Sequence, residues 1–252
     1  GERLRAYAEK DGRGYPDWAM RYVPIVRRLE LEGGLDEALI VEIGTNENGF
    51  SRFSGKPVFA VDRAFEHVRA TVNSQNAVGV VADAAALPFR DDVFDVAACV
   101  ETFEHMPAMV RFAAVAEIAR VMKADARAVI TFPHGEAART AEIRIREAYW
   151  KHTQGTMRWF EEHAAEELPD PQAVAEQFAA RLGDTHEIWR DKNANIRLWK
   201  WTWRVLMCGW PGRGNALAQV ILRWMTPLLC HAHFGTCYRA IIWVDPREKR
   251  VR

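Results

Sequence analysis

The stretch that decides the fold runs from Ala38 to Ala64 and reads ALIVEIGTNENGFSRFSGKPVFAVDRA. It begins with an apolar run, continues after Glu42 into a turn rich in Asn and Gly, and closes with a second apolar run that ends at Asp62. This pattern predicts a strand, a tight turn, a short helix and a second strand that ends in a carboxylate. Such a unit suits a nucleotide, because small residues let the backbone approach the ligand, the helix N-terminus offers free N–H groups, and the acid accepts hydrogen bonds from ribose.

The turn departs from the G-x-G-x-x-G pattern at its middle glycine, since it reads Gly44-Thr45-Asn46-Glu47-Asn48-Gly49. Asn tolerates positive φ better than most residues with a side chain, so we expect Asn46 to hold the turn while narrowing the space above it. A glycine-containing turn without a ligand remains an alternative. A dinucleotide dehydrogenase would share this turn and Asp62, but it does not account for the sequence that follows.

Several further blocks follow in order. An apolar run at 78–81 leads into ADAAALPF, a run at 94–100 leads into ETFEHMP, and a helical stretch that ends near Lys123 precedes an apolar strand from Ala126 to Phe132. With these blocks, residues 38–135 resemble the class I S-adenosylmethionine-dependent methyltransferases, in their small-molecule branch. The combination is much more specific than any one motif.

The resemblance implies an α/β fold with a Rossmann-like, mostly parallel sheet of seven strands in the order 3-2-1-4-5-7-6, helices on both faces, and a helical insertion near the C-terminus. The last strand would run antiparallel, and strands six and seven are expected near 186–189 and 238–244. We expect an N-terminal helical segment over 1–36, a cofactor-binding core over 37–135, and substrate-side helices with closing strands over 136–252. The tryptophan-rich helical insertion would span about 195–229.

The resemblance also implies S-adenosylmethionine as the cofactor. The predicted contacts are Glu42, Gly44, Thr45, Asn46, Asp62, Arg63, Asp83, Ala84 and Glu101. Residues of the first turn would line the amino-acid end of the cofactor, Asp62 would bind its ribose, and Asp83 with the Ala84 N–H would bind the adenine. Solvated acids at strand ends are the alternative for the carboxylates. The short spacing from Gly44 to Asp62 predicts a first helix about one turn shorter than is usual in the family.

Methyl transfer mainly requires that the protein place the acceptor atom in line with the methyl group, because a sulfonium methyl group is already activated. A hydroxyl acceptor would additionally need a base. His105 is the predicted catalytic base, since the unperturbed imidazole pKa lies near the working pH, and His134 is a second candidate. Packing is the alternative role for both. No metal is predicted: the cysteine and histidine cluster at 230–237 matches no zinc spacing and is interpreted as packing.

The length and amino-acid composition limit the classes of protein to which the chain can belong. The chain has 252 residues, of which 49% are hydrophobic, enough for one large domain with a proper core. No uncharged apolar stretch of 18 residues and no signal-peptide core are present, and the four cysteines lack CxxC spacing. A cytoplasmic location is therefore expected.

The net charge of zero conceals a basic tail. From His186 to Arg252 there are 12 Lys and Arg against 4 acids, and seven of the ten tryptophans lie there. Two helical stretches, 195–207 and 216–229, are expected around a breaker-rich turn at 209–214. Interleaved Trp, Arg and Lys suit an anionic membrane surface, which suggests peripheral attachment, while packing of the tryptophans on the sheet edge is the alternative. Nucleic-acid binding is the least favoured of the three interpretations, because the tail lacks a continuous basic stripe on a recognised module.

The expected function is methyl transfer to a small-molecule, glycan or lipid-linked acceptor, with a hydroxyl as the expected target. The alternative is a methyltransferase-like fold that has lost cofactor binding and serves as a binding or scaffold module. Asn46 is the feature that keeps this alternative open.

Overall fold

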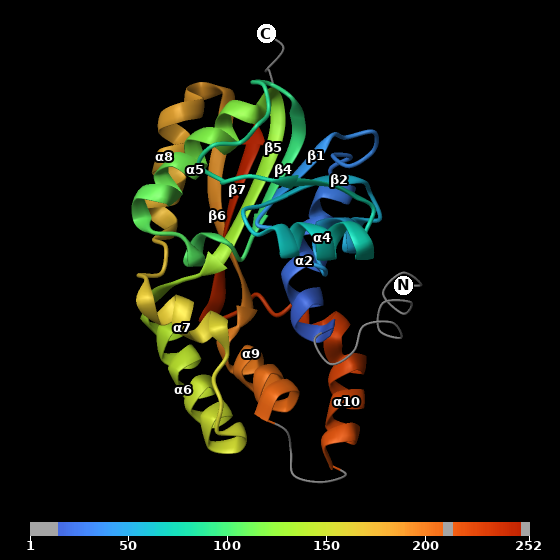
Figure 1. Ribbon diagram of the computed structural model, residues 1–252, viewed down its shortest axis with the longest axis vertical. Helices are drawn as coiled ribbons and strands as arrows, with labels where there is room; N and C mark the ends of the chain where they lie inside the picture. The colour runs from blue at the N-terminus through green and yellow to red at the C-terminus, as the bar shows by residue number, and fades with distance from the viewer. Residues whose placement is uncertain (1–14, 209–213, 248–252) are drawn as a thin grey trace.

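The computed structural model describes residues 15–208 and 214–247 of the chain. These residues form a seven-stranded sheet in the order β3-β2-β1-β4-β5-β7-β6, which confirms the predicted order (Figure 1). The strands are β1 (Ile40–Ile43), β2 (Val58–Asp62), β3 (Ala77–Val81), β4 (Phe94–Val100), β5 (Met122–Pro133), β6 (His186–Asn195) and β7 (Cys237–Pro246). Neighbouring strands from β3 to β5 are parallel, whereas β7 pairs antiparallel with both β5 and β6.

Helices connect the strands. They are α2 (Tyr15–Leu31), α3 (Phe50–Ser54), α4 (Phe65–Ser74), the 3₁₀ turn η1 (Phe103–His105), α5 (Ala108–Val121), α6 (Gly135–Thr153), α7 (Arg158–Ala165), α8 (Pro171–Leu182), the 3₁₀ turn η2 (Gly183–Thr185), α9 (Ile196–Trp203), the π-helical turn η3 (Arg204–Cys208) and α10 (Gly214–Leu229). The first crossover helix, α3, has only 5 residues, as the short spacing predicts. Helix α8 begins where Asp170 accepts hydrogen bonds from the Gln172 and Ala173 N–H groups, with Pro171 at its first position.

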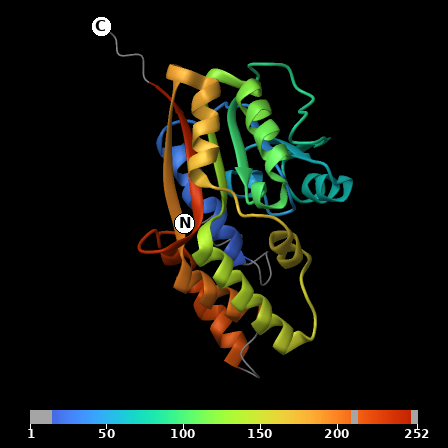
Figure 2. The same cartoon turned by 90° about the vertical axis from the view of Figure 1, so that its left-hand side faces the viewer.

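Two apolar layers cover the sheet, one on each face. One joins α2, α3 and α10 to residues such as Ile40, Val129 and Trp243. The other joins α5 and α8 to Val41, Ile130 and other residues of the same strands, because successive side chains of a strand point to opposite faces. Figure 2 shows helices on both sides of the sheet.

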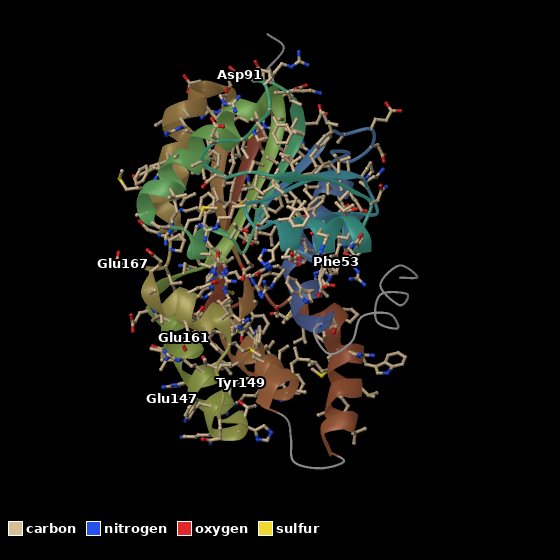
Figure 3. All side chains as sticks on the ribbon, in the orientation of Figure 1. Phe53, Asp91, Glu147, Tyr149, Glu161 and Glu167 are labelled. Atoms are coloured by element: carbon tan, nitrogen blue, oxygen red, sulfur yellow. The ribbon has the colours of Figure 1, made fainter. Side chains whose placement is uncertain are left out.

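A helical part lies beyond the carboxyl ends of the parallel strands. Helices α6, α7, α9 and α10 gather there, with one end of α2 among them (Figure 1). A third apolar cluster joins α6, α7 and α9 to Tyr238 of β7. Figure 3 places Glu161 of α7 between the sheet and the far end of α6, where Glu147 and Tyr149 lie, and Asp91 at the opposite end of the molecule. Ligands of open α/β sheets bind at this carboxyl edge.

The insertion between β6 and β7 consists of α9, η3 and α10, as expected. Most of the breaker-rich turn predicted at 209–214 lies outside the described residues. Strand β6 is longer than the predicted 186–189, because its ladder with β7 continues from His186 to Asn195. Helices α7 and α8 are separated by residues 166–170, which are not helical and precede Pro171.

Candidate active site

A cavity of about 820 Å³ opens between the carboxyl edge of the sheet and the helical part. The loops that follow β1, β2, β3 and β4 form its sheet side, and residues of α2, α7 and α9 form the other. The volume lies in the range that holds a small molecule or cofactor. Every predicted cofactor contact except Glu42 lines this cavity, as does His105.

Gly44 lets the backbone of the first turn reach the cavity. Its φ is +79°, and a Cβ at this position would overlap the side chain of Thr102, with the Thr102 Cβ only 2.6 Å away. The N–H groups of Gly44 and Thr45 donate to the Val61 carbonyl, so the turn is tied to β2. Glycine is therefore required both by conformation and by space.

Glu42 lies behind the turn and does not line the cavity, contrary to the predicted direct contact. Its buried carboxylate accepts hydrogen bonds from Tyr22 Oη at 3.0 Å, Phe50 N at 2.9 Å and Thr45 Oγ1 at 3.2 Å. Burial raises its pKa to about 7, although the three donors oppose this shift. Glu42 thus joins α2, the first turn and the start of α3.

Asn46 holds the turn by a different mechanism from the expected one. Its φ is not positive; Gly44 takes the left-handed conformation instead. The Asn46 Oδ1 accepts a hydrogen bond from the Asn48 N–H at 2.8 Å, and the Asn46 carbonyl accepts one from Gln75 Nε2 at 2.6 Å. Such an Asx turn uses the side chain within the loop.

The acids after β2 and β3 lie on the cavity wall. Asp62 Oδ1 accepts from the Ala64 N–H at 2.7 Å, and its Oδ2 lies 3.4 Å from His67 Nδ1. Asp83 is exposed and accepts from the Ala85 N–H at 2.8 Å, next to the buried Ala84. The exposed Arg63 follows Asp62 at the same edge.

Glu101 takes part in a buried ionic network. Its Oε1 lies 3.0 Å from Arg239 Nε, and Arg239 also contacts Asp17 at 3.3 Å. Asp17 in turn pairs with Arg21 at 2.7 Å. Glu101 has a φ of +53°, which is costly for a residue with a side chain, so the network fixes a strained backbone at the cavity edge.

His105 faces a second histidine across the cavity wall. Its Nε2 lies 3.4 Å from His163 Nε2, and its Nδ1 lies 3.0 Å from Glu162 Oε2. Burial, and then the charge of His163, lower the His105 pKa to about 4. The imidazole is therefore neutral at neutral pH. His134, the second predicted base, does not line this cavity.

Several lining residues were not singled out from the sequence. They are Trp18 and Arg21 of α2, Trp159 and His163 of α7, Trp199 and Trp203 of α9, and Tyr238 of β7. The density of tryptophan in the tail was the available signal for two of them, and it was interpreted as packing or membrane contact. Trp199 and Trp203 are buried, so packing holds for these two.

The cysteine and histidine side chains at 230–237 are buried or contact other residues of the protein. Cys230 and Cys237 are buried, His231 Nε2 lies 3.0 Å from Arg27, and His233 contacts the Lys192 and Cys230 carbonyls. These contacts agree with a packing role at the end of α10.

Comparison with known proteins agrees with this geometry. The family of methyltransferase domains matches residues 42–130, which include the first turn, the acids of β2 and β3, and β4. No curated protein matches the sequence significantly.

Solved methyltransferases share the fold. An S-adenosylmethionine-dependent methyltransferase from Thermotoga maritima has a TM-score of 0.56 at 11% identity, and the match covers 98% of this chain and 99% of that one. Another from Archaeoglobus fulgidus has a TM-score of 0.50 at 15% identity, over 88% of this chain and 92% of that one. Residues 42–130 thus match a methyltransferase domain, and the strand order is that of the Rossmann-like S-adenosylmethionine-dependent methyltransferases to which the structure is similar.

Proposed function

We propose that the sheet side of the cavity holds S-adenosylmethionine through Gly44, Thr45, Asn46, Asp62, Arg63, Asp83, Ala84 and Glu101. The observation that carries this assignment is the first turn, where Gly44 lines the cavity with a φ of +79° and packs so closely against Thr102 that no Cβ fits. When bound, the cofactor supplies a methyl group already activated by sulfonium. Asp62 would accept hydrogen bonds from ribose, and Glu42 would position the turn from behind rather than touch the cofactor.

The acceptor would lie on the helical side of the cavity. Trp18, Trp159, Trp199, Trp203 and Tyr238 supply aromatic surface there, and His105 supplies a polar group. Aromatic walls with a few placed polar groups suit an amphipathic acceptor such as a small molecule, a glycan or a lipid-linked compound. We propose transfer to an acceptor hydroxyl, with His105 placed to accept its proton.

The outer surface of α10 supports action at a membrane surface. Leu217, Val220, Ile221, Trp224 and Leu228 are all exposed and form one stripe along the helix, since they follow the spacing i, i+3, i+4, i+7 and i+11. Among the described helices, none is long and apolar enough to cross a bilayer. We therefore propose peripheral attachment to anionic lipid at the inner face of the membrane, with the enzyme in the cytoplasm.

Titration calorimetry tests the cofactor site. The wild-type chain should bind S-adenosylmethionine and its demethylated product, and Asp62→Ala should weaken binding by at least about tenfold, as expected for lost charge-assisted hydrogen bonds. Glu66→Ala, on the exposed start of α4, is the matched control. Absence of heat with the wild type at millimolar cofactor would favour the scaffold alternative.

Radiolabelled methyl groups test the acceptor class. Cell extract incubated with the enzyme and labelled cofactor is separated into protein, RNA, lipid and water-soluble fractions. Label in the lipid or water-soluble fraction is expected, and label chiefly in protein or RNA would contradict the proposal. His105→Ala should lower turnover by about 10²-fold or more while cofactor binding stays intact.

A further inference from the structure

Three side chains converge on the helical side of the cavity. Glu104 and His105 belong to η1, directly after β4, and His163 comes from α7, 58 positions after His105. The two Nε2 atoms are 3.4 Å apart, and Glu104 Oε1 lies 3.9 Å from His163 Nε2. One nitrogen or oxygen atom of each of the three residues lies within 4.8 Å of the others.

Carboxylates lie behind both imidazoles. Glu142 Oε1 lies 2.9 Å from His163 Nδ1 and accepts a hydrogen bond from Tyr238 Oη at 2.6 Å. Glu162 Oε2 lies 3.0 Å from His105 Nδ1. At His163 the hydrogen-bonded carboxylate favours the proton on Nδ1 and leaves a lone pair on Nε2, the arrangement that outer carboxylates give to metal-binding histidines. At His105 the carboxylate is near, but Nδ1 makes no hydrogen bond among the described residues.

The two Nε2 atoms face each other at 3.4 Å, so either one of them carries a proton and donates it to the other, or a cation lies between them. Glu104 favours the cation. Its side chain is 1% exposed, and its Oε2 has no hydrogen-bond partner among the described residues. A cation at this point would offset the cost of the buried carboxylate.

We propose that Glu104, His105 and His163 bind one divalent first-row transition metal ion, and Zn²⁺ is the probe we choose. Two imidazoles and one carboxylate are a donor set that such ions favour, with further positions open to the cavity. Ligands around a tetrahedral ion lie about 3.3 Å apart when its bonds are about 2.0–2.1 Å long. The His105 and His163 nitrogens already have this spacing, whereas Glu104 Oε1, at 3.9 Å from His163 Nε2, lies somewhat farther away.

The protein holds the site on two anchored elements. Arg139 of α6 donates to the carbonyls of His163 and Glu166, so α7 is fixed to α6. The η1 turn is fixed by Arg111, whose Nε donates to the Phe103 carbonyl at 2.8 Å. Ligands on rigid supports bind without a large loss of conformational entropy.

The use of the ion rests on the proposed function. An acceptor hydroxyl bound at an open position would lose its proton more readily, because a divalent cation lowers the pKa of a bound hydroxyl. His105 would then act as a ligand, and the proton would leave to solvent or to another base. Metal binding itself is independent of methyl transfer.

The test is Zn²⁺ titration of chelator-treated wild-type protein, with metal content measured by mass spectrometry after purification. One ion per chain is expected, with a dissociation constant of about 10 μM or lower. Co²⁺ should give the visible absorption bands of a nitrogen- and oxygen-coordinated ion. Glu104→Gln and His163→Gln should each lower affinity by at least about 100-fold, and Glu162→Gln, on the partly exposed outer carboxylate, by about tenfold.

His152→Gln is the matched control, because His152 is exposed on α6 and away from the cluster, and it should bind Zn²⁺ like the wild type. Circular dichroism and calorimetry with S-adenosylmethionine on the same preparations report folding and the cofactor site separately. A folded wild type that binds cofactor but binds Zn²⁺ no more tightly than Glu104→Gln would overturn the metal site. Zn²⁺ binding without cofactor binding would instead overturn the proposed function and leave the metal site standing.

Discussion

At the scale of single residues, the first turn depends on a pair of constraints that act from opposite sides. Thr102 of the loop after β4 fills the space above Gly44, and the Glu42 carboxylate fills the space beside Gly49, where a Cβ would lie 2.9 Å from the Glu42 Cδ. Both glycines are thus required by close neighbours, Glu42 from the strand that leads into the same turn and Thr102 from a distant part of the chain. The sequence shows the glycines but not the contact with Thr102, which helps to explain why the spacing alone is a weak motif.

Gly44→Ala should therefore lose both stability and cofactor affinity. We expect a loss of about 1–3 kcal/mol in the free energy of unfolding from backbone strain, with the overlap at Thr102 added to it. Gly135→Ala is the matched control, since Gly135 has a φ of +76° and no atom near its would-be Cβ. Urea unfolding and titration with S-adenosylmethionine measure the two effects. Equal cofactor affinity in both variants would show that the close packing of Gly44 against Thr102 does not position the cofactor site.

Glu42 predicts a pH dependence of stability. Its pKa is about 7 in the folded state against 4.5 as the ordinary value, so the folded state binds the proton more tightly. The resulting stabilisation is fully present below pH 4.5 and is lost as pH rises through about 7, up to about 3 kcal/mol in total. Glu42→Gln keeps an oxygen for Tyr22 and Phe50 and carries no charge.

Urea unfolding of the wild type and Glu42→Gln between pH 4.5 and 8 measures this effect as a difference, because the other titrating groups are common to both proteins. The advantage of the wild type over Glu42→Gln should shrink steadily as pH rises. Glu66→Gln, on the exposed first turn of α4, should track the wild type at every pH. Parallel curves for the wild type and Glu42→Gln would mean that the three donors keep the carboxylate ionised throughout.

At the scale of elements, the sequence predicts the features that depend on local residue patterns and on the direction of the strands. The strand order, the short α3 and the insertion between β6 and β7 follow from apolar runs and turn residues in order. The pairing of Glu104 and His105 with His163 does not, because α7 meets η1 only through packing of the helical part. The role of α2 in lining the cavity was missed for the same reason. Side chains that meet across such distances in sequence leave no periodic signal.

Helix α10 illustrates how one element can serve two environments. Its inner face buries Ala218, Leu222 and Leu229 in the layer shared with α2 and the sheet. Its outer face exposes a second apolar stripe in which Trp224 is 75% and Leu228 is 73% exposed. The sequence analysis posed membrane contact and packing as alternatives for the tryptophan-rich tail. Packing accounts for Trp199, Trp203 and Trp243, but it does not account for Trp224.

At the scale of the whole molecule, charge and cavity position favour an enzyme that approaches a surface. The basic tail brings Arg197 and Arg204 to the exposed side of α9 and η3, in the same insertion as the apolar stripe of α10. The acceptor side of the cavity is lined by α9, so the insertion that would meet the lipid also forms a wall of the site. A lipid-linked acceptor would then have a short path from the membrane surface to the cavity.

Vesicle binding tests this arrangement. The protein should sediment with anionic vesicles, and its indole fluorescence should shift to the blue as Trp224 enters the headgroup region. Release should follow as salt rises, because the cationic share of the attraction is screened over a Debye length of about 10 Å at 0.1 M. Neutral vesicles should bind more weakly, since only the apolar stripe then contributes.

Two tryptophan variants locate the contact. Trp224→Ser should abolish most of the blue shift and weaken sedimentation, because it removes the largest side chain of the α10 stripe. Trp150→Ser removes a tryptophan that is 53% exposed on α6, and it should bind vesicles like the wild type. Equal losses in the two variants would indicate non-specific adsorption of exposed aromatic side chains. If the wild-type protein neither sediments nor shifts its fluorescence at low salt, the exposed stripe does not stabilise membrane binding. Helix α10 would then have a packing role only, and the acceptor would be a soluble molecule.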